Sequence, residues 1–98
     1  MKKINLTISG CMGRMGQQLI KSAKSNKNFK LSSLTENRTI NKKINGIRPE
    51  LNSENAFKKS EVIIDFTSPN CTIEILRIAS KLKKKVVIGT TGFNQRQE

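Results

Sequence analysis

The chain has 98 residues, of which 35% are hydrophobic, and it carries 19 Lys and Arg against 7 Asp and Glu, a net charge of +12. This length suffices for one small domain or for part of a larger one. With no histidine and only two distant cysteines, Cys11 and Cys71, the composition argues against a zinc site, and we expect no bound metal.

The positive charge by itself is compatible with a basic nucleic-acid-binding module, which remains an alternative. The lysines, however, are scattered over the whole chain, and aromatic residues do not alternate with them as a base-stacking surface requires. No apolar run resembles a signal peptide or a membrane span. We therefore expect a cytoplasmic protein that binds neither nucleic acid nor a membrane.

The chain begins with a predicted strand, Lys3–Ser9, in which apolar and polar residues alternate. A helix pattern extends from Gly13 to about Lys24. Between and within these elements three glycines stand three residues apart, at Gly10, Gly13 and Gly16. A strand that enters a helix through such a turn can hold a phosphate, because N–H groups at the helix start are unpaired and the helix dipole favours an anion.

The middle of the chain is more polar. A turn at 25–28 precedes a second predicted strand, Phe29–Leu34, which a right-handed crossover would make parallel to the first. Residues 36–49 have no sustained period and many turn formers, and we predict a surface loop there. Residues 53–57 are predicted as a short helical turn.

The last third repeats the alternation of strand and helix. The apolar run within Glu61–Phe66 is typical of a strand covered on both faces. Ser68 and Pro69 are good residues for starting a helix, which we expect to continue to about Lys83. The remaining predictions are a strand at Val86–Ile88, a loop at Gly89–Phe93 and a new helix start at Asn94. This order predicts an α/β fold, a Rossmann-like parallel sheet with flanking helices.

One acidic residue has the position expected of a ribose-binding group. Glu36 follows Gly16 by 20 residues (36 − 16), close to the end of the second strand. Dinucleotide-binding domains have a carboxylate there, which accepts hydrogen bonds from the adenosine ribose. Arg38 could reach a 2′-phosphate, or it could be a plain surface arginine. The glycine spacing departs from the usual fingerprint, because Met12 stands in place of the second glycine.

The other candidate segments follow predicted strands, where open α/β sheets bind ligands. They are Phe66-Thr67 and Gly89-Thr90-Thr91-Gly92, in which glycine permits a close approach and threonine supplies hydroxyl groups. Asp65 is expected to be a hydrogen-bonded structural acid rather than a general base. Cys11 is expected to be a reduced small residue rather than a reactive thiol.

Four segments together resemble the N-terminal half of the 4-hydroxy-tetrahydrodipicolinate reductase (dihydrodipicolinate reductase) family. They are Ile-Ser-Gly-Cys-Met-Gly-Arg-Met-Gly at 8–16, Thr-Glu-Asn-Arg at 35–38, Ile-Asp-Phe-Thr-Ser-Pro at 64–69 and Val-Ile-Gly-Thr-Thr-Gly-Phe at 87–93. The resemblance implies an oxidoreductase of lysine biosynthesis through diaminopimelate. Members of the family reduce a cyclic product of aspartate semialdehyde and pyruvate to tetrahydrodipicolinate with NADPH or NADH.

The resemblance also implies roles for individual residues. The pyrophosphate of the cofactor would be held by Gly10, Cys11, Met12, Gly13, Arg14 and Met15. Glu36 would bind the adenosine ribose, and the nicotinamide end would lie against Gly89, Thr90 and Thr91. Asn37 stands where members that use NADPH often have arginine, so the choice between NADPH and NADH stays open.

The family's proton-donating histidine, the lysine beside it, the substrate-binding residues and the tetramer-forming sheet all follow the loop at 89–93. The resemblance therefore implies that residues 1–98 are an incomplete NAD(P)-binding Rossmann domain, truncated before the C-terminal substrate and tetramerisation domain. We expect no catalytic residue in this chain and no catalysis by it alone; the small-molecule substrate and the homotetramer belong to the full-length protein. The alternatives are a half of an aspartate or homoserine dehydrogenase, the basic nucleic-acid module, and a degenerate fragment without activity.

Overall fold

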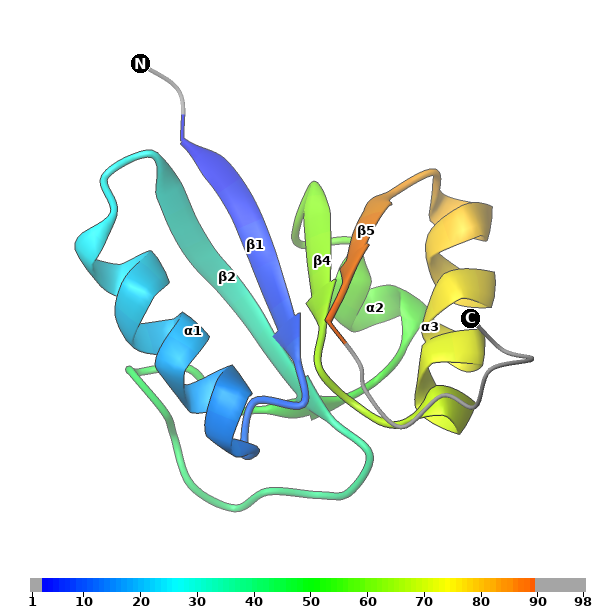
Figure 1. Cartoon of the computed structure of the whole chain (residues 1–98), viewed down its shortest axis with the longest axis horizontal. Coiled ribbons are helices and arrows are strands. Elements are labelled where there is room, and N and C mark those ends of the chain that lie inside the picture. Colours follow the sequence, from blue (N-terminus) through cyan, green and yellow to red (C-terminus); the bar gives the residue numbers. More distant parts are fainter. Residues whose placement is uncertain (1–2, 90–98) are drawn as a thin grey trace.

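A computed structural model describes residues 3–89 as a five-stranded parallel sheet with strand order β3-β2-β1-β4-β5. The strands are β1 (Ile4–Ser9), β2 (Phe29–Glu36), β3 (Glu50–Leu51), β4 (Val62–Asp65) and β5 (Lys85–Ile88). The helices are α1 (Arg14–Ser25), α2 (Glu54–Phe57) and α3 (Pro69–Leu82) (Figure 1). The predicted Rossmann-like α/β fold is confirmed.

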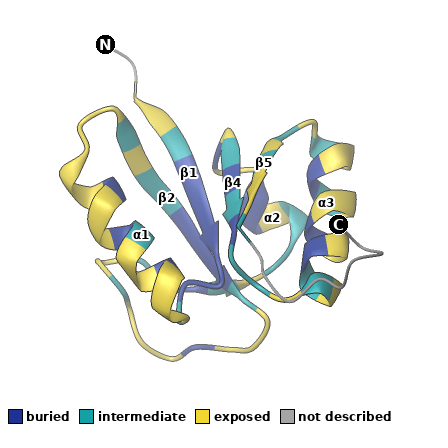
Figure 2. Cartoon of the chain, in the orientation of Figure 1, coloured by how far each residue is buried: buried dark blue, intermediate teal, exposed yellow. Residues whose placement is uncertain are grey.

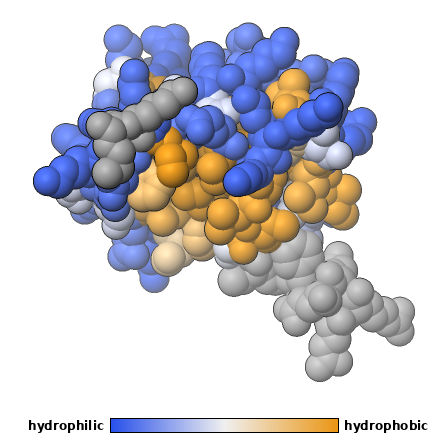
Figure 3. All heavy atoms as spheres, turned by 90° about the horizontal axis from the view of Figure 1, so that it is seen from above, coloured by the Kyte–Doolittle hydropathy of each residue, from blue (hydrophilic) through white to orange (hydrophobic). Residues whose placement is uncertain are grey.

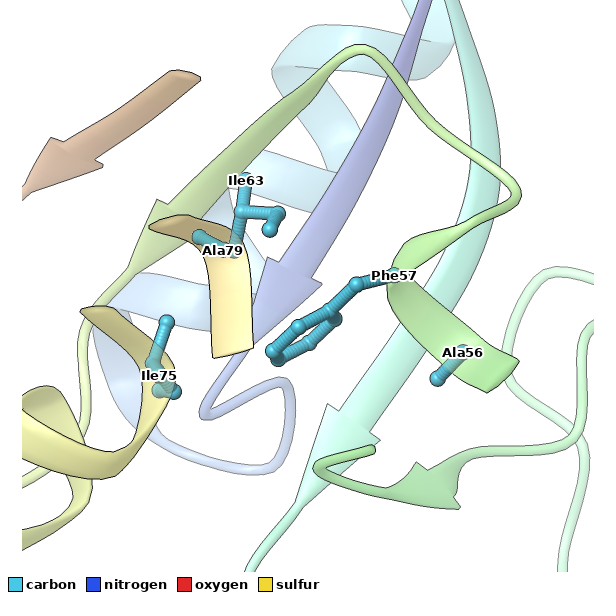
Figure 4. Close-up of a cluster of buried hydrophobic side chains, with 5 residues drawn as sticks. All are labelled: Ala56, Phe57, Ile63, Ile75 and Ala79. Atoms are coloured by element: carbon cyan, nitrogen blue, oxygen red, sulfur yellow. The ribbon is translucent and has the colours of Figure 1, made fainter. Parts of the chain in front are cut away.

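The helices pack on the sheet through two apolar clusters. Under α1, buried residues of β1, β2, the glycine turn and the helix meet at Ile8, Cys11, Ile20 and Leu34. The other cluster joins α2 and α3 to β4 and consists of Ala56, Phe57, Ile63, Ile75 and Ala79 (Figure 4). Because a right-handed crossover from β1 to β2 and one from β4 to β5 advance in opposite directions, their helices lie on opposite faces of the sheet.

Two features of the middle segment differ from the prediction. The strand β2 continues to Glu36, two residues beyond its predicted end, and the short edge strand β3 was not predicted. Residues 37–49 form a loop as expected, but Ile40 is buried. The loop also holds a tight turn, in which Ile44 and Ile47 exchange backbone hydrogen bonds of 2.8 and 2.9 Å. Asn45 and Gly46 have the positive φ angles, 55° and 79°, of a type I′ hairpin turn.

The face of the sheet that carries α1 is only partly covered. A groove of about 280 Å³ lies beside the helix, lined mainly by apolar residues of β1, β4 and β5. Val87 of β5 is 56% exposed and Ile4 of β1 is 38% exposed. Figure 3 shows an apolar patch on the surface of the molecule, and Figure 2 shows that burial is concentrated at the carboxyl ends of the central strands.

No helix in the described range is long and apolar enough to cross a membrane. Within residues 3–89, no three His, Cys, Asp or Glu side chains come together as a metal site. The predicted helix start at Asn94 lies outside the described residues.

Candidate functional site

The turn between β1 and α1 requires glycine at two positions. Gly10 has a φ of +85°, and a Cβ atom there would lie 2.4 Å from the carbonyl oxygen of Phe66. A Cβ atom on Gly16 would lie 2.2 Å from the carbonyl oxygen of Gly10, so this glycine lets α1 pack directly against the turn. Gly13 is not constrained in this way, since the nearest atom to its Cβ would be 3.4 Å away. At two of the three regularly spaced glycines, steric contact thus explains why no larger residue fits.

The start of α1 is open to an external anion. Gly13 is the N-cap, no side chain caps the helix, and its first turn contains no acidic residue. The N–H groups of Gly10 and Cys11 donate to the carbonyl of Thr35, at 3.0 and 3.3 Å. The helix start leaves its first N–H groups, those of Arg14 and Met15, without acceptors inside the helix. Of the predicted pyrophosphate-binding residues, these two therefore have N–H groups for an incoming oxyanion.

Glu36 is the last residue of β2 and lies against the glycine turn. Its Oε2 accepts a hydrogen bond of 2.9 Å from the backbone N–H of Met12. Its Oε1 accepts one of 3.1 Å from the N–H of Asn37. A carboxylate has about four acceptor positions, so each oxygen can still accept a hydroxyl donor. The structure thus brings together the two sequence features, the turn and the acid 20 residues after it, that were predicted to share a ligand.

The side chain of Cys11 points away from this open edge. It is fully buried in the cluster under α1. Burial and the negative charge of Glu36 raise the pKa of the Cys11 thiol from 9.0 to about 11, against the opposing effects of a backbone hydrogen bond and the positive charge of Arg38. The thiol is therefore protonated at neutral pH, as expected for an unreactive cysteine.

The loop that follows β4 is held together by Asp65, which is fully buried. Its Oδ1 accepts from the backbone N–H and the hydroxyl of Thr67, at 3.0 and 2.5 Å. Its Oδ2 accepts from the Thr72 hydroxyl, at 2.5 Å. Asp65 thus ties the loop to the first turn of α3, which confirms the prediction of a hydrogen-bonded structural acid.

Gly89, which follows β5, packs against the loop after β4. Its N–H donates to the backbone carbonyl of Asp65 at 2.8 Å. A Cβ atom on Gly89 would lie 2.2 Å from the ring of Phe66. Phe66 therefore lies against both Gly10 and Gly89, at the edge where the carboxyl ends of β1, β4 and β5 meet (Figure 1). The other two predicted residues of this segment, Thr90 and Thr91, lie outside the described residues.

Sequence reasoning missed a lysine-rich hollow of about 460 Å³ between α1 and the loop after β2. Lys21 and Lys24 line it from α1, and Lys42 and Lys43 line it from the loop. The helical spacing of Lys21 and Lys24 is visible in the sequence. Their proximity to the loop lysines depends on how residues 37–49 fold back, which no local pattern reveals.

The chain is similar in sequence to one family of enzymes. The family model described as "Dihydrodipicolinate reductase, N-terminus" matches residues 4–98. A 4-hydroxy-tetrahydrodipicolinate reductase of Pelagibacter ubique is 74% identical over the whole chain, which covers 38% of that relative's length. The chain thus spans well under half of the relative it matches.

Solved structures show the same fold. A dipicolinate-bound dihydrodipicolinate reductase from Paenisporosarcina sp. TG-14 superposes with a TM-score of 0.77 at 25% identity, over 98% of this chain and 40% of that one. An aspartate semialdehyde dehydrogenase with NADP from Candida albicans reaches a TM-score of 0.76 over 92% of this chain and 30% of that one. At 12% identity, the second likeness concerns the fold alone. The sequence match decides between these enzymes: the chain belongs to the dihydrodipicolinate reductase family and corresponds to its N-terminal part.

Proposed function

We propose that this chain is the cofactor-binding part of an enzyme that reduces 4-hydroxy-tetrahydrodipicolinate to tetrahydrodipicolinate with NADPH or NADH, in lysine biosynthesis through diaminopimelate. Family membership supports the reaction. The observation that carries the cofactor assignment is the hydrogen bond between Glu36 and the N–H of Met12. It joins the acid expected to bind the ribose to the glycine turn.

In this proposal the chain grips and orients the cofactor, which supplies the hydride when bound. The open N–H groups of Arg14 and Met15 at the start of α1 receive the pyrophosphate, which lies against the turn from Gly10 to Met15. The free acceptor positions of Glu36 receive the hydroxyl groups of the adenosine ribose. The nicotinamide end extends past Phe66 toward Gly89, Thr90 and Thr91.

The proposal includes a division of labour with the rest of a full-length protein. The chain contains no histidine, so it lacks the proton donor that the family resemblance implies. The substrate site and the homotetramer interface would belong to the part of the relatives beyond the matched 38%. We therefore propose that the 98-residue chain is cytoplasmic and binds the cofactor, but that it does not turn over substrate by itself.

Calorimetric titration of the chain with NADPH and with NADH tests the cofactor site. We expect saturable binding of at least one of them, weakened about tenfold or more by Glu36→Ala, because hydrogen bonds to a charged acceptor are lost. Glu74→Ala is the matched control, since Glu74 is an exposed acid on α3. Absence of binding, or equal losses in the two variants, would contradict the proposal.

An assay of cofactor oxidation with freshly generated substrate tests the second half of the proposal. We expect no turnover by the chain alone. Clear turnover would show that the proton donor and the substrate site do not lie where the proposal puts them.

A further inference from the structure

The side chain of Gln17 extends back over the start of α1. Gln17 is the fourth residue of this helix, and its backbone N–H donates to the Gly13 carbonyl at 3.0 Å. Side chains on a helix lean toward its amino end. The Gln17 amide therefore extends beyond the first helical residue, and its Nε2 donates to the Met12 carbonyl at 2.8 Å.

Met12 is thus held through both of its backbone polar groups. Its N–H donates to Oε2 of Glu36 at 2.9 Å, and its carbonyl accepts the hydrogen bond from Gln17. Only two rotatable bonds separate the N–H and the carbonyl of one residue, so fixing the carbonyl also narrows the directions open to the N–H. Two consecutive hydrogen bonds therefore link α1, through Met12, to the carboxylate expected to bind the ribose.

The rest of the turn is anchored by the backbone, whereas Met12 is anchored by side chains. The N–H groups of Gly10 and Cys11 donate to the Thr35 carbonyl, and that of Gly13 donates to the Gly10 carbonyl at 3.1 Å. Within residues 3–89, both hydrogen bonds of the Met12 backbone end on side chains. The direction of the Met12 N–H therefore depends on Gln17 more than on the sheet.

The contact made by Gln17 leaves the helix start open. A conventional capping side chain accepts hydrogen bonds from N–H groups of the first turn and would compete there with an anion. Gln17 instead donates to a carbonyl oxygen, so it orders the turn without occupying the N–H groups of Arg14 and Met15. The contact requires a donor, which an amide supplies and an ionised carboxylate of the same length does not.

From these contacts we infer that Gln17 is a positioning residue for the cofactor: by holding Met12, it sets the direction in which Glu36 presents its free acceptor positions to the ribose. The inference rests on the proposed function, because it concerns the ribose contact of Glu36. Gln17 is exposed, and its effect on the cofactor passes through Met12.

A double-mutant cycle on the Kd of NADPH and of NADH, measured by calorimetry, tests the inference. Gln17→Met keeps the length and helix propensity of the side chain but removes the donor. We expect it to weaken binding about threefold to tenfold, the range for one lost hydrogen bond. In a Glu36→Ala background the same substitution should have no further effect, because no carboxylate is left to orient.

Gln18→Met is the matched control. Gln18 is the next residue of α1, is also exposed, and makes no side-chain hydrogen bond within residues 3–89. We expect this variant to bind both cofactors as the unaltered chain does. The melting temperatures of the two methionine variants should be alike, so that a loss of binding is not a loss of folded protein.

Hydrogen exchange measured by NMR follows the Met12 N–H directly, in the absence of cofactor. Gln17→Met should speed exchange of this N–H, because its hydrogen bond to Glu36 opens more often. The N–H groups of Gly10 and Cys11, which donate to the Thr35 carbonyl, should keep their rates. Gln18→Met should change none of the three rates.

Three results would overturn the inference and leave the proposed function standing. They are equal losses from Gln17→Met with and without Glu36, equal losses from Gln17→Met and Gln18→Met, and an unchanged exchange rate at Met12 in Gln17→Met. Absence of cofactor binding by the unaltered chain would overturn the proposed function and the inference together.

Discussion

The two halves of the sheet differ in how completely their faces are covered. In the half formed by β1 and β2, α1 covers one face, and the residues on the other face, Thr7, Ser9, Ser33 and Thr35, are at most 1% exposed. In the half formed by β4 and β5, α3 covers one face, but the α1 side remains a groove in which Val87 is 56% exposed. The β1–β2 half is therefore covered on both faces within the described residues, whereas the β4–β5 half keeps exposed apolar surface.

The largest expected effect on stability comes from Gly10, where the turn after β1 contacts the loop after β4. Gly10→Ala would put a Cβ atom 2.4 Å from the Phe66 carbonyl, at a φ of +85° that alanine rarely adopts. We expect a loss of more than about 3 kcal/mol in the free energy of unfolding, enough to unfold much of a small domain. Denaturant unfolding measures it. Gly13→Ala is the control, because its Cβ would be 3.4 Å from the nearest atom. Equal effects of the two substitutions would contradict the steric explanation.

The next effect belongs to the β4–β5 half alone. Asp65→Ala leaves the hydroxyl groups of Thr67 and Thr72 without the carboxylate that they now contact. The unfolding free energy should fall by about 3 kcal/mol, because the loop after β4 and the first turn of α3 lose the buried charged acceptor that joins them. Asp65→Asn should cost less, since its amide can satisfy both hydroxyls in part. If both variants were as stable as the unaltered chain, Asp65 would not organise this loop.

The cysteines report on the two halves separately. Cys11 is buried with a pKa raised to about 11, whereas Cys71 at the start of α3 is half-buried. At pH 8 a pKa raised from 9.0 to about 11 lowers the thiolate fraction of Cys11 about a hundredfold. Labelling with a thiol reagent should therefore modify Cys71 first, and a Cys71→Ser variant should react slowly until it unfolds. Fast labelling of that variant would contradict the burial of Cys11.

The raised pKa of Cys11 also predicts a pH dependence of stability. Folding favours the protonated thiol, so the contribution of this thiol to the free energy of unfolding is fully present below pH 9 and declines as the pH rises toward about 11. Cys11→Ala should remove this decline.

The smallest effect on stability is expected in the open groove. Val87→Lys places a charge on the exposed apolar face and should change the free energy of unfolding by less than about 0.5 kcal/mol. It should reduce self-association of the isolated chain, measured by sedimentation, because an exposed apolar face promotes association. Lys85→Gln on the same strand serves as the control that removes charge. Unchanged association would show that this face is not the one through which copies meet.

The sequence predicted the helices α1, α2 and α3 and four of the strands, but it missed the two-residue strand β3. The helices α1 and α3 have repeated apolar positions, and each is followed or preceded by a recognisable turn. The strand β3 has only two residues, too few to show a period. The end of β2 was missed because Thr35 and Glu36 are polar, although Thr35 is fully buried.

The candidate site divides in the same way. Glu36 was predicted from its distance to the glycines, and the structure brings its carboxylate to the Met12 N–H. The lysine-lined hollow was not predicted, because it forms only when the loop turn at Asn45 and Gly46 packs against α1. Local patterns locate groups along the chain, whereas a hollow depends on contacts between segments that are distant in sequence.

Phe66 has a consequence for how the site would respond to a ligand. Its carbonyl lies against Gly10 and its ring against Gly89, with no room for even one added methyl group at either contact. Phe66 therefore joins the turn after β1 and the start of the segment after β5 by close contacts on both sides. A dinucleotide that bridges them would find its surface already assembled, so binding would cost the protein little conformational entropy.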